Sequence, residues 1–187
     1  MTARTSSVEA TNELREALAS NDAFDRWYRR TVPRVYSYLL SRCGGDTALA
    51  EDLTQQTFVA AIDQRAAFDG RSEIVTWLCG IARHKLADHF RSMERQDRRR
   101  MELEVRQIRL EHDAVDRPGL DDRVAISEAL RSLPAAHQAV LAFVVLDGLS
   151  VGEAARLMHR TEKATRSLLH RARAQFRQAY GGELADD

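Results

Sequence analysis

Residues 149 to 178 contain two short amphipathic segments separated by only a few residues, and this spacing strongly restricts how the chain can fold. Ser150 precedes Glu153 by three residues, the pattern of a capping box at a helix start. The first helix is expected to end around His159, because Thr161 is a second N-cap candidate and apolar residues return at helical spacing after it. Two helices joined by a turn of about three residues form a helix-turn-helix.

The second of these segments is strongly basic. From residue 156 to residue 177 the chain has seven Lys or Arg residues and a single acid, a net charge of +6. The whole chain has no formal net charge, so this is a local concentration of the kind that binds phosphate. A solvated amphipathic helix is the simpler alternative. DNA binding is favoured because the capped two-helix pattern and the basic second helix occur together.

The rest of the sequence predicts an all-α protein with two small helical domains joined by a flexible acidic linker. Few prolines or glycines interrupt its helical periodicity. Between residues 101 and 122 seven acids oppose three bases, and Pro118-Gly119 interrupts the chain. The expected segments are a polar N-terminal extension (1–21), a first helical domain (22–100), the linker (101–122), a second helical domain with the helix-turn-helix (123–180) and a tail (181–187).

Helical spacing also places the individual helices. In the first domain we expect a helix from residue 22 to 43 that Pro33 kinks or divides, one over 47–67, and one from a Ser72 cap to about residue 100. In the second domain we expect helices over 123–132 and 135–147, and the latter should be the buried centre because it is the most apolar segment. Cys43, Cys79 and Trp77 are expected to be buried.

Two helix faces carry polar patterns that could bind a partner. The second helix has an acidic, amide-rich side, and periodicity alone favours an ordinary solvated face over a docking face there. The third helix has a basic side with interleaved imidazoles, which suits single-stranded or melted nucleic acid. The residues of these two sides are Glu51, Asp52, Gln55 and Gln56 on the second helix, and Arg83, His84, Lys85, His89 and Arg91 on the third.

Several other classes of protein are disfavoured. There is no run of about 18 apolar residues and no apolar core of a signal peptide, so a cytoplasmic protein is expected. His84 and Asp88 share a helix face, but no third ligand is placed nearby, so no metal site is expected. No phosphate-binding glycine loop or nucleophile elbow is present, so we expect neither catalysis nor a cofactor.

Four motifs occur in an order that resembles the extracytoplasmic-function (ECF) group of bacterial sigma-70 family RNA polymerase sigma factors. AEDLTQQTFVAAI at 50–62 is similar to the family's polymerase-binding segment, and TWLCGIARHKLADHFR at 76–91 to its promoter-melting segment. SLP at 132–134 and DGLS at 147–150 lead into the 149–178 stretch, which resembles the minus-35 reader. The resemblance covers the chain from about residue 22 to 178.

This resemblance implies a sigma factor that binds core RNA polymerase and directs promoter recognition, promoter melting and transcription initiation, with no catalysis of its own. The second helix would bind the β′ coiled coil, the third would hold the melted minus-10 strand, and the last would read the minus-35 element. The implied residues are, in that order, Asp52, Gln55, Gln56 and Phe58; Arg83, His84, Lys85, Asp88 and Arg91; and Lys163, Ala164, Arg166, Ser167, His170 and Arg171. Further implied partners are the β flap and an anti-sigma factor, and the linker would thread the polymerase's basic channel.

Four positions depart from the family pattern. His84 stands where the family usually has Asn, and His159 replaces the common glycine of the turn. Thr165 occupies a position normally filled by Val, and Leu168 one often filled by Arg. These departures predict an altered base preference at both promoter elements and a looser packing of the last helix on its domain.

The sequence also allows two other hypotheses. An autonomous helix-turn-helix regulator would use the N-terminal helices for dimerisation or sensing, although the sequence has no heptad seam for a dimer. A nucleic-acid-processing enzyme would use His84, Asp88 and His89, but it lacks a placed set of ligands or general bases.

Overall fold

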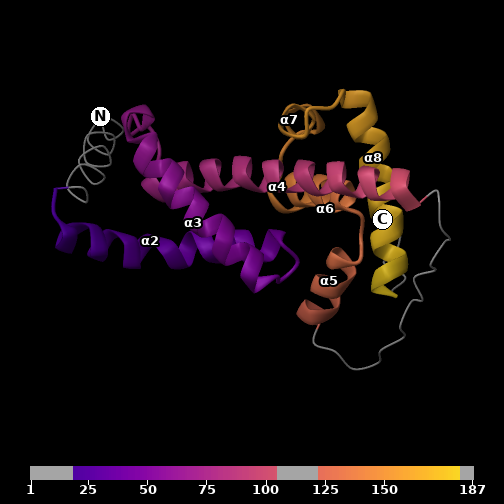
Figure 1. Ribbon diagram of the computed structural model, residues 1–187, viewed down its shortest axis with the longest axis horizontal. Helices are drawn as coiled ribbons and strands as arrows, with labels where there is room; N and C mark the ends of the chain where they lie inside the picture. The colour runs from indigo at the N-terminus through magenta and orange to yellow at the C-terminus, as the bar shows by residue number, and fades with distance from the viewer. Residues whose placement is uncertain (1–18, 105–121, 182–187) are drawn as a thin grey trace. The chain divides into compact units, whose positions relative to one another are not determined.

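The computed structural model describes residues 19–104 and 122–181, and every regular element in these ranges is helical (Figure 1). This confirms the all-α prediction. Residues 1–18 of the polar extension, residues 105–121 of the acidic linker and residues 182–187 of the tail lie outside the described residues. The elements are α2 (Asn21–Arg42), α3 (Thr47–Asp63), the 3-10 turn η1 (Arg65–Ala67), α4 (Ile74–Glu104), α5 (Asp122–Arg131), α6 (Ala135–Leu141), the π-helical turn η2 (Ala142–Leu146), α7 (Val151–Leu157) and α8 (Glu162–Tyr180).

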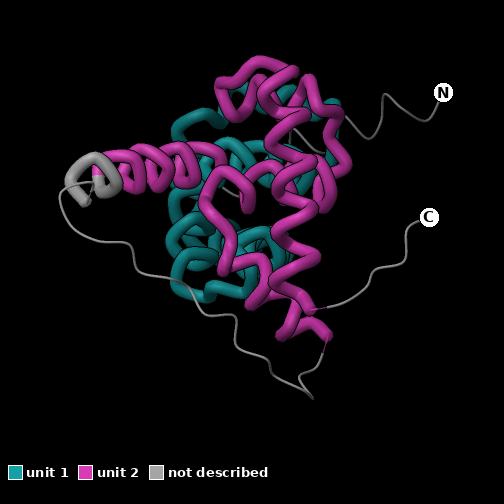
Figure 2. The backbone as a smooth tube through the Cα atoms, turned by 90° about the vertical axis from the view of Figure 1, so that its right-hand side faces the viewer, with its two compact units in different colours: residues 1–86 teal, residues 87–187 magenta. Residues whose placement is uncertain are grey.

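The chain separates into two compact units, residues 1–86 and 87–187 (Figure 2). The division falls inside α4, so the first part of this helix belongs to the first unit and the remainder to the second. Within the described ranges no helix is long and apolar enough to cross a membrane.

The described part of the first unit starts with two capped helices. The Ser20 hydroxyl accepts the backbone N–H of Ala23 at the start of α2, and the Asp46 carboxylate accepts that of Leu49 at the start of α3. Pro33 lies inside α2 but does not divide it, contrary to one of the two expected outcomes. Buried Thr31 and Val35 flank the proline, so tertiary packing holds the helix on both sides of it.

An aromatic cluster joins α2 to α3 in the core of the first unit. Phe58 is only 3% exposed, and its ring makes edge contacts with Trp27 and Tyr28 at centroid distances of 5.4 and 4.8 Å. Buried Thr54 and Thr57 donate their hydroxyls to backbone carbonyls four residues earlier, so these polar groups are satisfied within α3. One side of α3 is therefore fully committed to packing.

Three expectations about the first unit were wrong in detail. The second helix ends at Asp63 and continues only as the turn η1. Trp77 is half-buried rather than buried, and its ring packs beside that of Phe68 at a centroid distance of 5.0 Å near the start of α4. Cys79 is also half-buried, whereas Cys43 is buried as expected. Burial raises the pKa of the Cys43 thiol to about 12, so this thiol stays protonated near neutral pH.

The second unit is built around α8, which packs against α5, α6 and α7. Its largest fully buried side chains are Phe143, Val140 and Thr165. Small residues such as Ala154 and Ala172 are completely buried, which lets α7 and α8 approach closely. The second unit thus fixes the two helices predicted from residues 149–178 on a common core.

The segment 135–147 is not one buried α-helix, and this prediction was wrong. The α-helix ends at Leu141, and a π-helical turn follows in which Asp147 N–H bonds to the carbonyl of Ala142 at 3.0 Å. Within this turn Phe143 is fully buried, whereas Val145 and Leu146 are 53% and 45% exposed. Gly148 then adopts a φ of +67° and leads the chain into α7.

Candidate nucleic-acid interface

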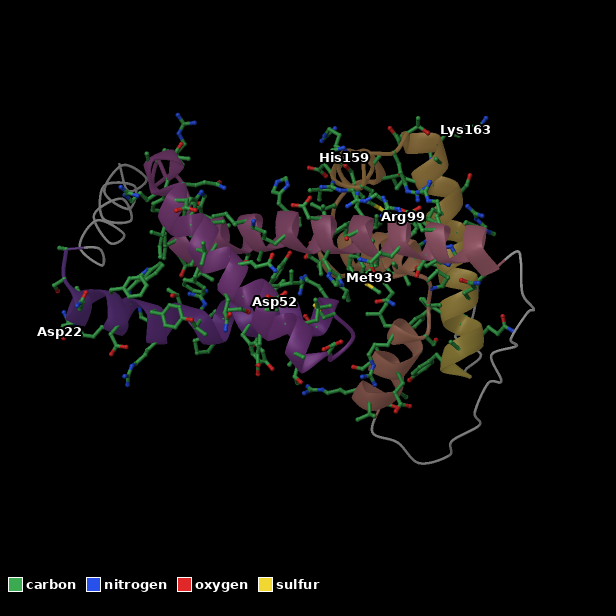
Figure 3. The ribbon with its side chains drawn as sticks, in the orientation of Figure 1. Asp22, Asp52, Met93, Arg99, His159 and Lys163 are labelled. Atoms are coloured by element: carbon green, nitrogen blue, oxygen red, sulfur yellow. The ribbon has the colours of Figure 1, made fainter. Side chains whose placement is uncertain are left out.

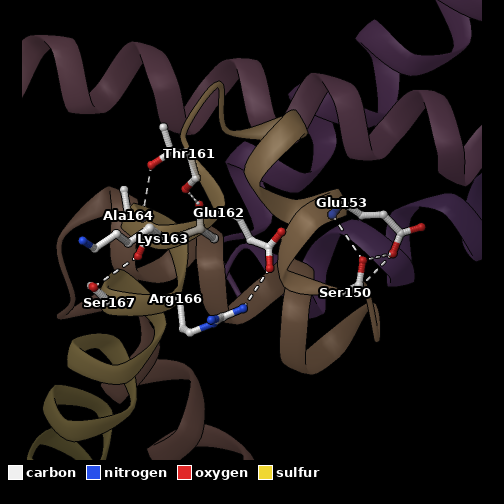
Figure 4. A network of polar contacts seen from close by, with 9 residues as sticks. Ser150, Glu153, Thr161, Glu162, Lys163, Ala164, Arg166 and Ser167 are labelled. Carbon is white, nitrogen blue, oxygen red and sulfur yellow. Dashed lines mark hydrogen bonds and ion pairs between the residues drawn. The ribbon is translucent and has the colours of Figure 1, made fainter.

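The helix-turn-helix begins with a complete capping box (Figure 4). The Ser150 hydroxyl accepts the Glu153 backbone N–H at 3.2 Å, and a Glu153 carboxylate oxygen accepts the Ser150 backbone N–H at 2.9 Å. Both contacts were predicted from the spacing of the two residues. They fix the first residue of α7 and therefore the position of the turn that follows it.

The turn between α7 and α8 is a Schellman motif centred on His159, which has a φ of +53°. The N–H of Arg160 bonds to the carbonyl of Ala155 at 2.9 Å, and the N–H of His159 bonds to that of Arg156 at 3.2 Å. The sequence predicted the position of this turn but not its conformation. Figure 3 shows His159 at the end of α7 and Lys163 at the start of α8.

Replacing His159 by glycine is expected to raise the free energy of unfolding of the second unit by up to about 1 kcal/mol, because glycine adopts positive φ without a Cβ clash. Valine is expected to lower it by about 1 kcal/mol or more, since a β-branched residue at positive φ is strongly disfavoured. Urea unfolding of the two variants tests this. His159→Ala removes the imidazole but keeps the Cβ, so a gain for alanine equal to that for glycine would contradict the backbone explanation.

Helix α8 has one buried and one exposed side. Thr161 caps its start by accepting the N–H of Ala164 at 3.2 Å. The buried side consists of Thr165, Leu168, Leu169 and Ala172. All six residues that the resemblance assigned to the minus-35 element are exposed, namely Lys163, Ala164, Arg166, Ser167, His170 and Arg171. The candidate set therefore lies on one accessible side of a single helix.

Two of the departures from the family pattern lie on the buried side of α8. Thr165 is completely buried and donates its hydroxyl to the carbonyl of Thr161 at 3.0 Å, while Leu168 is 4% exposed. Neither side chain is exposed where a base could contact it. These two residues can therefore influence base preference only indirectly, by changing how α8 packs on the second unit.

Polar contacts on the exposed side of α8 orient several candidate side chains. Arg166 donates from Nη2 to Glu162 Oε1 at 2.8 Å (Figure 4). Ser167 donates its hydroxyl to the carbonyl of Lys163 at 3.2 Å, and Arg171 Nε lies 3.4 Å from the carbonyl of Ser167. Glu162 was not among the predicted residues. Its spacing of four residues before Arg166 was the signal that could have identified it.

The candidate minus-10 residues lie along α4. His84 and Asp88 are exposed, whereas Arg83, Lys85 and Arg91 are half-buried. Within the second unit, Arg91 forms an ion pair with Asp88 and donates to the carbonyl of Leu157 at the end of α7. Cations favour helix C-termini, which accounts for the second contact. In this arrangement the Arg91 guanidinium contacts protein groups.

Asp88, one of the residues considered for a metal or catalytic site, forms an ion pair with Arg91. Among residues 19–104 and 122–181 no three His, Cys, Asp or Glu side chains are grouped closely enough to hold a metal ion.

The candidate polymerase-binding residues on α3 divide between surface and core. Asp52, Gln55 and Gln56 are exposed, and Gln56 donates from its side-chain amide to the Asp52 carboxylate at 2.9 Å. Phe58 is buried in the aromatic cluster, so it supports this face from within the first unit. Val59 is 60% exposed on the same helix, although it was not among the predicted residues.

Two protein-family models match the chain. The model of sigma-70 region 2 matches residues 27–96, and that of sigma-70 region 4 matches residues 123–176. Together they cover more than half of the 187 residues. The matched ranges contain α3, the candidate part of α4 and the helix-turn-helix.

Individual proteins give the same result. The chain is 37% identical over 159 residues to the ECF RNA polymerase sigma factor BldN of Streptomyces coelicolor, an alignment that covers 81% of the chain and 58% of that protein. It is 34% identical over 182 residues to the ECF sigma factor SigC of Mycobacterium tuberculosis, with 92% of each covered. The sigma factor RpoE of Bartonella quintana, solved with the anti-sigma factor NepR, has a TM-score of 0.53 at 22% identity and covers 86% of this chain and 98% of its own. The last comparison concerns the fold alone.

Proposed function

The chain belongs to the ECF group of the bacterial sigma-70 family, whose members direct RNA polymerase to start transcription, and from this premise we propose how its exposed faces divide that work. Sigma factors are not enzymes, so each face acts by binding. The proposed domains are region 2 over residues 22–100 and region 4 over 123–180, joined by the acidic linker 101–122.

Docking on core polymerase is assigned to the exposed side of α3. Asp52, Gln55 and Gln56 offer a carboxylate and two amides to a helical partner of complementary charge, the β′ coiled coil. Val59 adds an exposed apolar group on the same helix. Phe58 acts indirectly, because its ring fixes α3 against Trp27 and Tyr28.

Capture of the melted minus-10 strand is assigned to α4, through Arg83, His84, Lys85, Asp88 and Arg91. Cationic groups beside a carboxylate and an imidazole can bind phosphates and hydrogen-bond to an unstacked base. His84 is exposed and stands where the family usually has Asn, so it is the residue expected to alter which base is captured.

Minus-35 recognition is assigned to α8, and this part of the proposal depends on one observation. Six candidate residues, Lys163, Ala164, Arg166, Ser167, His170 and Arg171, are all exposed on one side of a helix whose start is fixed by a structured turn. A recognition helix held in this way enters the major groove with its N-terminal residues at the base edges. Arg166 is the proposed base reader, since arginine pairs with both acceptors of guanine.

Further partners follow from the same proposal. Region 4 would also contact the β flap, and the acidic linker would occupy the polymerase's basic channel. An anti-sigma factor is the expected inhibitor, which would cover the same faces. Because core polymerase and promoter DNA are in the bacterial cytoplasm, the protein is proposed to act there.

Run-off transcription from a genomic DNA library tests the proposed function. Core RNA polymerase from the source bacterium, with this protein added, is expected to produce new transcripts whose start sites share motifs near minus 10 and minus 35. Polymerase alone is the control. Absence of new transcripts, together with specific binding of duplex DNA by the free protein, would instead support the autonomous regulator.

A further inference from the structure

Glu162 is the one acid on a strongly basic stretch of the recognition helix. It follows the N-cap Thr161, and its Oε1 accepts Arg166 Nη2 at 2.8 Å (Figure 4). Its other carboxylate oxygen, Oε2, lies close to Gly152 of α7. A Cβ atom at that glycine would be 3.6 Å from Oε2. The carboxylate thus lies between α7 and the proposed base reader.

The effect of this acid on DNA binding is opposite to that of its neighbours. A carboxylate beside the side of α8 that is proposed to face DNA repels the phosphate backbone, and this repulsion weakens binding to every sequence alike. The stabilisation that an exposed i, i+4 ion pair gives a helix is small. Glu162 also lies in the first turn of α8, where an acid stabilises the helix start. An effect of Glu162 on sequence discrimination, by contrast, needs a side chain that meets bases.

The contact with Arg166 supplies such an effect. Arginine has a planar guanidinium group with donors along fixed directions. When Glu162 holds Nη2, the plane of the guanidinium is set and its remaining N–H groups point along defined lines. A guanidinium oriented before DNA arrives loses less conformational freedom on binding than a mobile one.

We propose that Glu162 is a specificity-determining positioning residue, which holds Arg166 in the orientation that reads one guanine of the minus-35 element. The inference rests on the proposed assignment of α8 to that element. It predicts that Glu162 lowers affinity for all duplexes while raising discrimination at a single base pair, the one that Arg166 reads.

Open-complex formation by the complete holoenzyme measures both effects. The probe is a promoter mapped by run-off transcription, with each base pair of its minus-35 region substituted in turn. Arg166→Ala is expected to remove discrimination at one base pair, and Glu162→Ala to reduce it at the same base pair by roughly 3- to 10-fold. Glu162→Gln keeps an acceptor oxygen and should retain part of the discrimination. Both Glu162 variants should bind mismatched promoters more tightly than the wild type, because both remove the negative charge.

Asp25→Asn is a matched control, because Asp25 forms an i, i+4 ion pair with Arg29 at 2.9 Å in α2. The two acids, Asp25 and Glu162, are 55% and 57% exposed, and their arginine partners are 78% and 72% exposed. Asp25→Asn makes the same change of charge away from α8 and should leave the discrimination profile unchanged. Circular dichroism melting of each variant checks that the helices remain folded.

Three results with the Glu162→Ala variant would overturn the inference. The first is unchanged discrimination at every base pair of the minus-35 region. The second is an equal loss of discrimination at all base pairs, as expected of a purely structural role. The third is a loss of discrimination at a base pair that Arg166→Ala does not affect. If Arg166→Ala itself affects no base pair, the assignment of α8 fails and the inference fails with it. If Arg166→Ala acts at one base pair and Glu162→Ala does not, the inference alone fails.

Discussion

Replacing Phe143 by alanine is expected to lower the free energy of unfolding of the second unit by about 3–5 kcal/mol. The Phe143 side chain is completely buried, and truncating it removes apolar burial and leaves a cavity among side chains that can collapse only partly. The loss is a large fraction of the total stability of a typical domain. Without this ring the core beneath α7 and α8 would no longer hold the recognition helix.

Val145 provides a matched control for this change. It lies two residues from Phe143 in the same π-helical turn, yet its side chain is 53% exposed. Val145→Ala is therefore expected to change the free energy of unfolding by no more than about 0.5 kcal/mol. Thermal and urea unfolding of the full chain, followed by circular dichroism, compare the two variants. Equal losses would mean that the segment is buried throughout, as its apolar sequence suggested.

The contrast between these two residues shows where sequence reasoning reached its limit. Caps and turns could be predicted because a few neighbouring side chains determine them, as Ser150 and Glu153 do at the start of α7. The π-helical turn could not, because Val145 and Leu146 are as apolar as the buried residues before them. Tertiary packing decides which of these consecutive apolar residues face the core, and no local pattern in the segment marks the π-helical insertion.

The candidate interface was predicted to a similar extent. Helical periodicity separated the exposed from the buried residues of α8, and the six assigned side chains are all accessible. Periodicity could not identify a residue that acts through another, which is why Glu162 was missed. Helical periodicity places Phe58 on the apolar side of its helix, where the structure buries it, whereas the family motif lists it among the docking residues because a motif does not record which way each residue faces.

Arg166→Ala is expected to weaken promoter recognition by the holoenzyme by about 1–3 kcal/mol while leaving affinity for core polymerase unchanged. Arginine that pairs with both acceptors of guanine contributes energy that alanine cannot replace. Open-complex formation on the mapped promoter, and fluorescence-detected binding to core polymerase, measure the two quantities separately. Arg29→Ala, which removes an equally exposed and ion-paired arginine from α2, should alter neither.

The exposed side of α3 should give the reverse result. Asp52→Ala combined with Gln55→Ala removes a carboxylate and an amide that are accessible in the first unit, far along the chain from the helix-turn-helix. Affinity for core polymerase is expected to fall by about 2 kcal/mol or more, as at the centre of a protein interface. When enough of the variant is added to saturate core polymerase, discrimination among minus-35 sequences should equal that of the wild type, because α8 is unaltered. If Arg166→Ala also reduced affinity for core polymerase, or if the α3 variant changed base preference, the two faces would be coupled and the division of work between them would be wrong.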